Sequence, residues 1–195
     1  MSPRSGLLKE AAALRCLYSI KNANVVSPHV IVSNNTDCAL MLYSYENEEL
    51  EIFITMEYID GIDLQDAPLD KMDFSTKFYI AVKLAEALNV LHLNGYAHSD
   101  IHTRNIKLLK KTSTPIIIDL GSCEKTTDLK NDISNYYKIV YFLFKERNHG
   151  NFDIDTGVPS TLRPFFDDVI HNNFESMKEI LDKFTEISFG LTLEK

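Results

Sequence analysis

Glycine, cysteine and tryptophan are scarce in this sequence of 195 residues, which holds seven glycines, three cysteines and no tryptophan. Its two nearest glycines, Gly150 and Gly157, are seven positions apart. A G-x-G-x-x-G turn or a P-loop needs glycines much closer together, because only residues without a β-carbon let several backbone N–H groups close on a phosphate. The sequence therefore contains neither of these phosphate-binding loops.

Basic residues and membrane-length apolar runs are lacking too. Lys and Arg number 20 against 28 Asp and Glu, a net charge of −8, which disfavours nucleic acid as a partner because such binding depends on neutralising phosphates. The longest apolar run, 139–144, is far shorter than the ~20 residues that span a bilayer. The odd number of widely spaced cysteines indicates neither a disulfide framework nor a zinc site. We expect a cytoplasmic or nuclear protein with no membrane span.

The remaining composition is that of a folded protein, with 45% apolar and 25% charged residues. Apolar periodicity predicts helices over 7–18, 73–93 and 132–144, and two more across 162–184 that divide near 172–173. Strand-like runs cover 30–33, 39–43 and 51–58, and residues 106–109 and 116–118 flank a turn typical of a hairpin. This order predicts an α+β fold.

One polar constellation stands between the predicted long helix and the hairpin. It is the loop His98-Ser-Asp-Ile-His-Thr-Arg-Asn105, and Asp119-Leu-Gly121 follows the second hairpin strand. Asn105 and Asp119 offer the oxygen ligands that Mg²⁺ prefers. Asp100 would face a metal-bound phosphate and orient or accept the proton of an attacking hydroxyl. The pattern therefore favours phosphoryl transfer, in which positioning and charge neutralisation dominate catalysis.

The loop, the hairpin and Asp-Leu-Gly together resemble the H-R-D-x-x-x-x-N loop and the D-F-G motif of the protein kinase superfamily. Two earlier segments agree in order: residues 10–17 look like the αC helix, and residues 53–64 are similar to strand 5 and the hinge. Asp132 resembles the αF aspartate that anchors the backbone of the catalytic loop. The resemblance covers roughly residues 8–145 and implies a protein-kinase-like α+β fold.

This resemblance implies one kinase-like domain over 1–195, with an incomplete N-lobe (the αC helix and antiparallel strands, 1–58), a hinge (59–64) and a shortened, mainly helical C-lobe (65–195). It implies ATP and Mg²⁺ as cofactors, with Asp100 as the catalytic base and Asn105 and Asp119 as metal ligands. The residues it assigns to adenine binding are Met56 (the gatekeeper), Glu57, Tyr58 and Ile59. Those it assigns to structural roles are Glu10, His98, Gly121 and Asp132.

Several departures from the kinase pattern bear on activity. No glycine loop or strand-3 lysine precedes the αC-like helix, so we expect Glu10 to lack its usual partner. Ser99 stands in place of the arginine of H-R-D, and only ten residues, without A-P-E, separate Gly121 from Asp132. His102 makes the loop H-x-D-x-H-x-x-N, which looks more like aminoglycoside or choline phosphotransferases and ABC1-type kinases. The acceptor is therefore open between a protein Ser/Thr and a small-molecule hydroxyl.

Three alternatives follow from the same residues. The chain is a pseudokinase or kinase mimic, whose N-lobe a protein partner completes or covers, or it is a fragment of a longer kinase. A zinc site at His98 and His102 is disfavoured because no third ligand cluster stands out. Cys123, just after Asp-Leu-Gly, is expected to be a small buried apolar residue.

Overall fold

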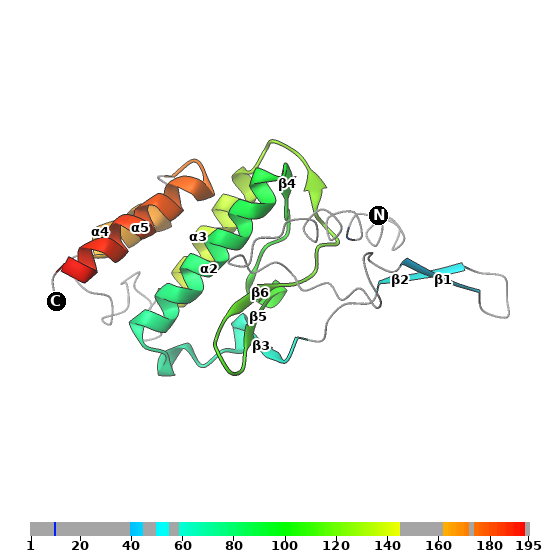
Figure 1. Cartoon of the computed structure of the whole chain (residues 1–195), viewed down its shortest axis with the longest axis horizontal. Coiled ribbons are helices and arrows are strands. Elements are labelled where there is room, and N and C mark those ends of the chain that lie inside the picture. The colour runs from blue at the N-terminus through cyan, green and yellow to red at the C-terminus, as the bar shows by residue number, and fades with distance from the viewer. Residues whose placement is uncertain are drawn as a thin grey trace.

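The computed structural model describes residues 10, 40–44, 50–54, 59–144, 162–171 and 174–193. Within these ranges the helices are α2 (Phe74–Leu93), α3 (Lys130–Phe144), α4 (Arg163–Ile170) and α5 (Met177–Leu193). The strands are β1 (Leu40–Ser44), β2 (Leu50–Ile54), β3 (Gly61–Asp63), β4 (Tyr96–Ala97), β5 (Ile106–Leu109), β6 (Pro115–Ile117) and β7 (Glu124–Lys125). Three short 3-10 helices are η1 (Leu64–Asp66), η2 (Leu69–Lys71) and η3 (Thr103–Asn105). The predicted α+β class is confirmed (Figure 1).

Strands β1 and β2 form the antiparallel hairpin expected from the strand-like runs at 39–43 and 51–58. Leu40 lies opposite Ile54, and Ser44 lies opposite Leu50. In Figure 1 this hairpin lies at the opposite end of the molecule from the C-terminus. The predicted strand 30–33 and, apart from Glu10, the predicted helix 7–18 lie outside the described residues; Glu10 itself is helical.

Helix α2 follows the predicted long helix closely, because its ends carry clear signals. Asp73 caps the N-terminus by accepting a hydrogen bond from the backbone of Thr76 at 2.8 Å. Hydrogen bonds from the side chain and from the backbone of Thr76 lower the pKa of the Asp73 carboxyl group. At the other end Gly95 has a φ of +76°, a conformation that glycine adopts without strain. The buried face of the helix includes Ile80, Leu84 and Leu88.

The central sheet has the order β3-β5-β6 and is antiparallel throughout. The β5–β6 hairpin confirms the prediction, with Ile106 opposite Ile117. Strand β3 was not predicted: its residues lie in the segment assigned to the hinge (59–64), and Gly61 pairs with Leu109. A β-carbon on Gly61 would lie 2.6 Å from the carbonyl oxygen of Leu108, so glycine permits this close approach.

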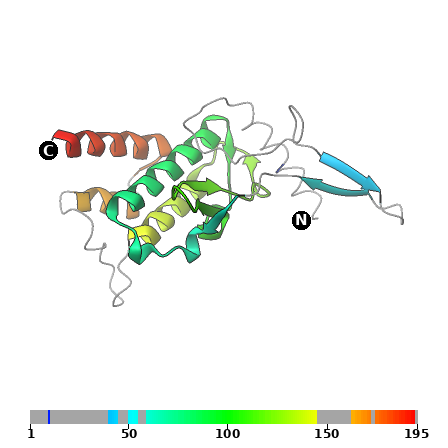
Figure 2. The same cartoon turned by 60° about the horizontal axis from the view of Figure 1, so that its bottom comes forward.

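The helices pack in layers beside this sheet. Helix α2 lies between the sheet on one side and α5 on the other, and in the view of Figure 1 α3 lies behind α2 and α4 lies behind α5, which the turned view confirms (Figure 2). An aromatic cluster joins α2 to the C-terminal helices: the ring of Phe166 lies 4.3 Å from that of Phe144, and Phe78 lies 5.2 Å from Phe184, centroid to centroid. The predicted division of the tail into two helices is confirmed. This packing fixes the positions of α2 and α3, which support the loop between β4 and β5.

Candidate active site

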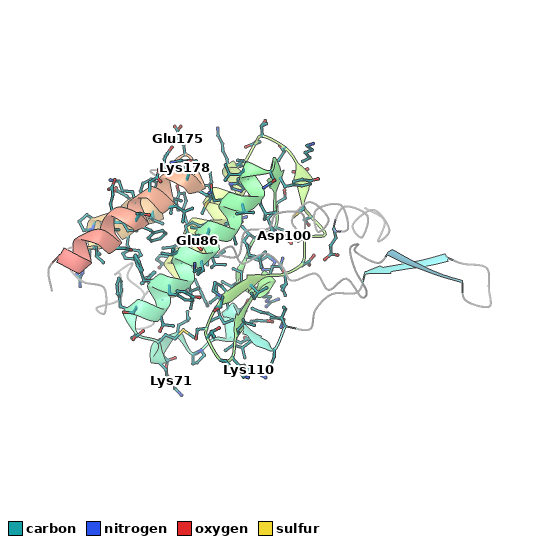
Figure 3. All side chains as sticks on the ribbon, viewed as in Figure 1. Lys71, Glu86, Asp100, Lys110, Glu175 and Lys178 are labelled. Atoms are coloured by element: carbon teal, nitrogen blue, oxygen red, sulfur yellow. The ribbon has the colours of Figure 1, made fainter. Side chains whose placement is uncertain are left out.

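Asp132 on α3 holds the backbone of the loop between β4 and β5, residues 98–105. The side chain of Asp132 is fully buried, and its two oxygens accept hydrogen bonds from the backbone of His98 at 2.7 Å and of Ser99 at 2.8 Å. Next to it, Asn131 donates to the carbonyl oxygen of Ser99 at 3.0 Å. Ser99 has a φ of +67°, so these contacts hold a strained turn just before Asp100. Figure 3 labels Asp100 on this loop.

The same carboxylate is charged despite its burial. Burial raises the pKa of Asp132, but hydrogen bonds from His92, His98 and Ser99 outweigh burial and leave the pKa below its ordinary value. The His92 contact joins its Nε2 to Oδ2 of Asp132 at 3.0 Å. The buried carboxylate of Asp132 thus accepts hydrogen bonds from three donors, and these bonds offset the free-energy cost of removing its charge from water.

His98 is the first residue of this loop, and its side chain is fully buried. Its Nδ1 accepts from the backbone N–H of Asp100 at 3.4 Å, while Nε2 has no hydrogen-bond partner in the described part of the chain. Burial lowers the pKa of His98, although the carboxylate of Asp132 and the backbone of Ile118 favour the charged ring. The ring is therefore neutral at pH 7 and supports the backbone of Asp100.

Asn105 connects this loop to the strand that leads into Asp119. Its buried side chain donates from Nδ2 to the carbonyl oxygen of Asp100 at 3.0 Å. Its own carbonyl oxygen accepts from the backbone of Ile118 at 2.9 Å. The nitrogen of the amide is engaged in this bond, whereas no hydrogen bond reaches its oxygen from the residues described. Asn105 thus joins the Asp100 loop to the residue before Asp119.

Asp119 begins a tight turn with Gly121. It has a φ of +60°, and its Oδ1 accepts from the backbone N–H of Gly121 at 3.1 Å. Asp119 is exposed at the end of the β5–β6 ribbon, and within the described ranges its other carboxylate oxygen has no such bond.

Glu10, only 8% exposed, lies beside this turn. Burial and the charge of Asp119 raise the pKa of Glu10, and a hydrogen bond from the backbone of Leu120 opposes them. The backbone of Leu120 is thus a hydrogen-bond partner of Glu10, whereas the expected absence of its usual lysine partner stays a prediction. The two neighbouring carboxylates repel each other, and a cation between them would relieve this repulsion.

The chemistry of the donors fits a magnesium ion. Among the described residues no three His, Cys, Asp or Glu side chains gather closely enough to form a metal site of their own. Mg²⁺, however, is commonly held by one or two protein oxygens together with phosphates and water. The amide oxygen of Asn105 and the carboxylate of Asp119 have this donor chemistry, and their role as metal ligands stays a prediction.

Some of the predicted adenine-binding residues lie outside the described residues, namely Met56, Glu57 and Tyr58. Ile59 is half-buried, and its carbonyl oxygen accepts from the backbone of Gly61 at 2.9 Å. The segment after Ile59 reaches the loop through Gln65, whose side-chain oxygen accepts from Nε of Arg104 at 2.9 Å. The residues for ATP contact thus stay predictions.

Sequence reasoning missed three residues that shape the loop: His92, Asn131 and Gln65. The signal for His92 is its position in the last turn of α2, where a polar side chain on an otherwise apolar helix end can be the partner of a buried acid. Asn131 directly precedes Asp132 and shares its direction toward the loop. No pattern in the sequence pointed to Gln65, because its partner Arg104 lies 39 residues away.

A loop anchored on a buried aspartate, followed by a β-ribbon and an Asp-Leu-Gly turn, defines a protein-kinase-like protein. Comparison with known families agrees: residues 45–151 match the ABC1 atypical kinase-like domain. This match covers more than half of the 195 residues. The chain belongs to the ABC1 atypical kinase-like family.

Curated relatives are named as kinases. The chain is 34% identical over 86 residues to serine/threonine-protein kinase D of Synechocystis sp., covering 44% of this chain and 16% of that protein. It is 34% identical over 93 residues to the probable serine/threonine-protein kinase mkcE of Dictyostelium discoideum (47% and 13%) and 29% identical over 90 residues to serine/threonine-protein kinase PknB of Mycobacterium tuberculosis (45% and 14%). The aligned parts thus span less than a fifth of each relative. No helix in the described ranges has the length and apolarity needed to cross a membrane.

Proposed function

We propose that the chain is an ATP- and Mg²⁺-dependent phosphotransferase whose acceptor is a hydroxyl group of a protein Ser/Thr or of a small molecule. The observation that carries the proposal is the double attachment of Asn105. Its side chain fixes the backbone of Asp100 and its carbonyl fixes Ile118, the residue before Asp119. The three groups of the predicted site are thus tied to one another through Asn105.

Each group has a separate task in the proposed reaction. Asp100 orients the acceptor hydroxyl and takes its proton as the acceptor oxygen bonds to the γ-phosphorus. The bond from that phosphorus to the β,γ-bridging oxygen breaks, and ADP leaves. Asn105 and Asp119 would hold Mg²⁺, which neutralises phosphate charge when bound. His98, being neutral and buried, keeps the backbone of Asp100 in place.

Titration with Mg·ATP tests the proposal. In Asp119→Asn the amide oxygen still accepts from Gly121, so the turn is kept while the charge is lost. A matched control is Asp70→Asn, because Asp70 is an exposed acid on η2, away from the loop. We expect thermal stabilisation by Mg·ATP and release of phosphate from ATP in the wild type and in Asp70→Asn, and neither in Asp119→Asn.

Two other outcomes have clear meanings. Equal phosphate release by the wild type and Asp119→Asn would exclude the proposed metal site. Stabilisation by Mg·ATP without any transfer, unchanged by Asp100→Asn, would identify a pseudokinase that binds nucleotide. The acceptor is then sought by comparing peptides that contain Ser or Thr with small hydroxyl compounds as phosphate acceptors.

A further inference from the structure

His102 lies on the same loop as Asp100, two residues later, and its ring contacts groups on both sides. Its backbone is extended, with φ −158° and ψ 174°, and it caps η3. On one side Nδ1 accepts a hydrogen bond from the backbone N–H of Arg104 at 3.2 Å. On the other, Nε2 lies 3.7 Å from Oδ2 of Asp100. The ring therefore stands between the backbone that follows it and the predicted catalytic carboxylate.

The first contact fixes the position of the proton on the ring. A ring nitrogen that accepts a hydrogen bond carries no proton, and neutral imidazole has one proton in total. Because Nδ1 accepts from Arg104, the proton is on Nε2, the nitrogen that faces Asp100. His102 thus presents an N–H donor to the carboxylate, and the backbone of Arg104 selects this tautomer.

The backbone of Asp100 is held by hydrogen bonds at two points, but these bonds do not fix the orientation of its side chain. Its N–H donates to Nδ1 of His98, and its carbonyl oxygen accepts from Asn105. The side chains of Asp100 and His102 are about half exposed, at 54% and 45%, so packing alone does not fix the carboxylate. Within the described residues, the Nε2 of His102 is the polar side-chain group that contacts this carboxylate, at 3.7 Å.

We propose that His102 is a positioning residue for Asp100: its Nε2–H holds Oδ2 of the carboxylate so that Oδ1 faces the acceptor hydroxyl. This inference rests on the proposed function, because the orientation matters only if Asp100 handles that proton. At 3.7 Å the contact is longer than a hydrogen bond, and such contacts commonly shorten when substrate binds. His102 keeps its own proton throughout the transfer.

Two variants of His102 separate this role from a purely structural one. In His102→Gln the terminal amide nitrogen replaces Nε2 as a donor toward Asp100, but the acceptor for Arg104 is lost. In His102→Asn the amide oxygen replaces Nδ1 as the acceptor for Arg104, but the side chain no longer reaches Asp100. The two substitutions therefore each keep one half of the ring's contacts.

The inference predicts opposite ranks for the two variants in Mg·ATP turnover. We expect His102→Gln to keep kcat within about threefold of the wild type, whereas His102→Asn lowers kcat about tenfold to a hundredfold, the usual cost of a misplaced catalytic group. The KM for ATP stays within about twofold in both, since ATP does not contact the ring in this proposal. A larger loss in His102→Gln than in His102→Asn would overturn the inference and leave only a loop-capping role.

A measurement without turnover distinguishes failure of this inference from failure of the proposed function. Nitrogen-15 NMR of the full labelled chain at pH 7.5, with the His102 signals identified by their loss in His102→Gln, reports the tautomer directly. We expect the Nε2–H tautomer, with a Nε2 signal that moves in Asp100→Ala and not in the exposed control Asp70→Ala. An Nδ1–H tautomer, or a signal that ignores Asp100→Ala, would overturn the inference even if ATP is hydrolysed. The expected spectrum without any ATP use would instead refute the proposed function, while the contact between His102 and Asp100 would stand.

Discussion

Removing the carboxylate of Asp132 gives the most direct test of how the candidate site is held. The side chain is fully buried and accepts from His98 at 2.7 Å, from Ser99 at 2.8 Å and from His92 at 3.0 Å. In Asp132→Ala the two backbone N–H groups and the His92 ring lose their acceptor. Breaking a buried charged network in this way costs about 3–5 kcal/mol, and we expect the free energy of unfolding to fall by that amount at pH 7.

The pH dependence of this loss has a definite sign. The pKa of Asp132 in the folded protein lies below its ordinary value of 3.8. Its contribution to stability is therefore complete above the pKa of the unfolded chain and is lost as the pH falls through the lower, folded pKa. We expect the difference in unfolding free energy between the wild type and Asp132→Ala to be constant from about pH 5 to 7 and to shrink below about pH 4.

Urea unfolding followed by circular dichroism measures both effects. Asn131→Ala is the matched control: it removes one exposed hydrogen bond to the same loop, from Nδ2 to the carbonyl of Ser99, and should cost less than about 1 kcal/mol. Asp132→Asn keeps one acceptor oxygen and should lie between the two. A loss below about 1 kcal/mol in Asp132→Ala would show that the carboxylate does not hold the loop.

Three further predictions concern the surrounding fold. Gly61→Ala forces a β-carbon to within 2.6 Å of the Leu108 carbonyl oxygen and should cost about 1–3 kcal/mol in thermal unfolding. Gly95→Ala meets no atom but keeps a φ of +76°, so it should cost only about 1 kcal/mol; the reverse order would contradict the packing of β3. Burial raises the pKa of Cys123 to about 12. In a variant whose other two cysteines are replaced by serine, we therefore expect this thiol to resist a disulfide reagent at pH 8 until the protein is unfolded. Rapid labelling of the native protein would disprove its burial. Phe166→Ala should lower the free energy of unfolding in urea by about 3–5 kcal/mol, because this ring is fully buried among aromatic neighbours. A loss under about 1 kcal/mol would mean that the neighbouring side chains fill the space left by the ring.

Features carried by local signals were predictable from the sequence. Helix α2 has a capping residue in Asp73 and a stop at Gly95, and the β5–β6 ribbon has a polar turn between two apolar runs. Periodicity and turn chemistry act over a few residues, so they survive in a single sequence. The loop 98–105 was located by its own residues in the same way.

Features made by distant pairing were not predictable. Strand β3 has three residues and β4 and β7 have two each, so none shows a period of its own. Each of these strands forms because a strand far along the chain supplies its hydrogen bonds; Tyr96, for example, pairs with Lys125. The contact of Glu10 with the backbone of Leu120 depends likewise on tertiary packing. Sequence alone predicted which residues form the candidate site, whereas the hydrogen bonds that connect these residues could be described only from the fold.

The attachment of the loop to Asp132 has a consequence for biosynthesis. The two amides that this carboxylate holds belong to residues 34 and 33 positions nearer the N-terminus. During translation, His98 and Ser99 therefore leave the ribosome well before their anchor does. The contacts that hold the strained turn at Ser99 cannot form until α3 has been made and has docked, so the nascent chain completes this loop only after residue 132 has been synthesised.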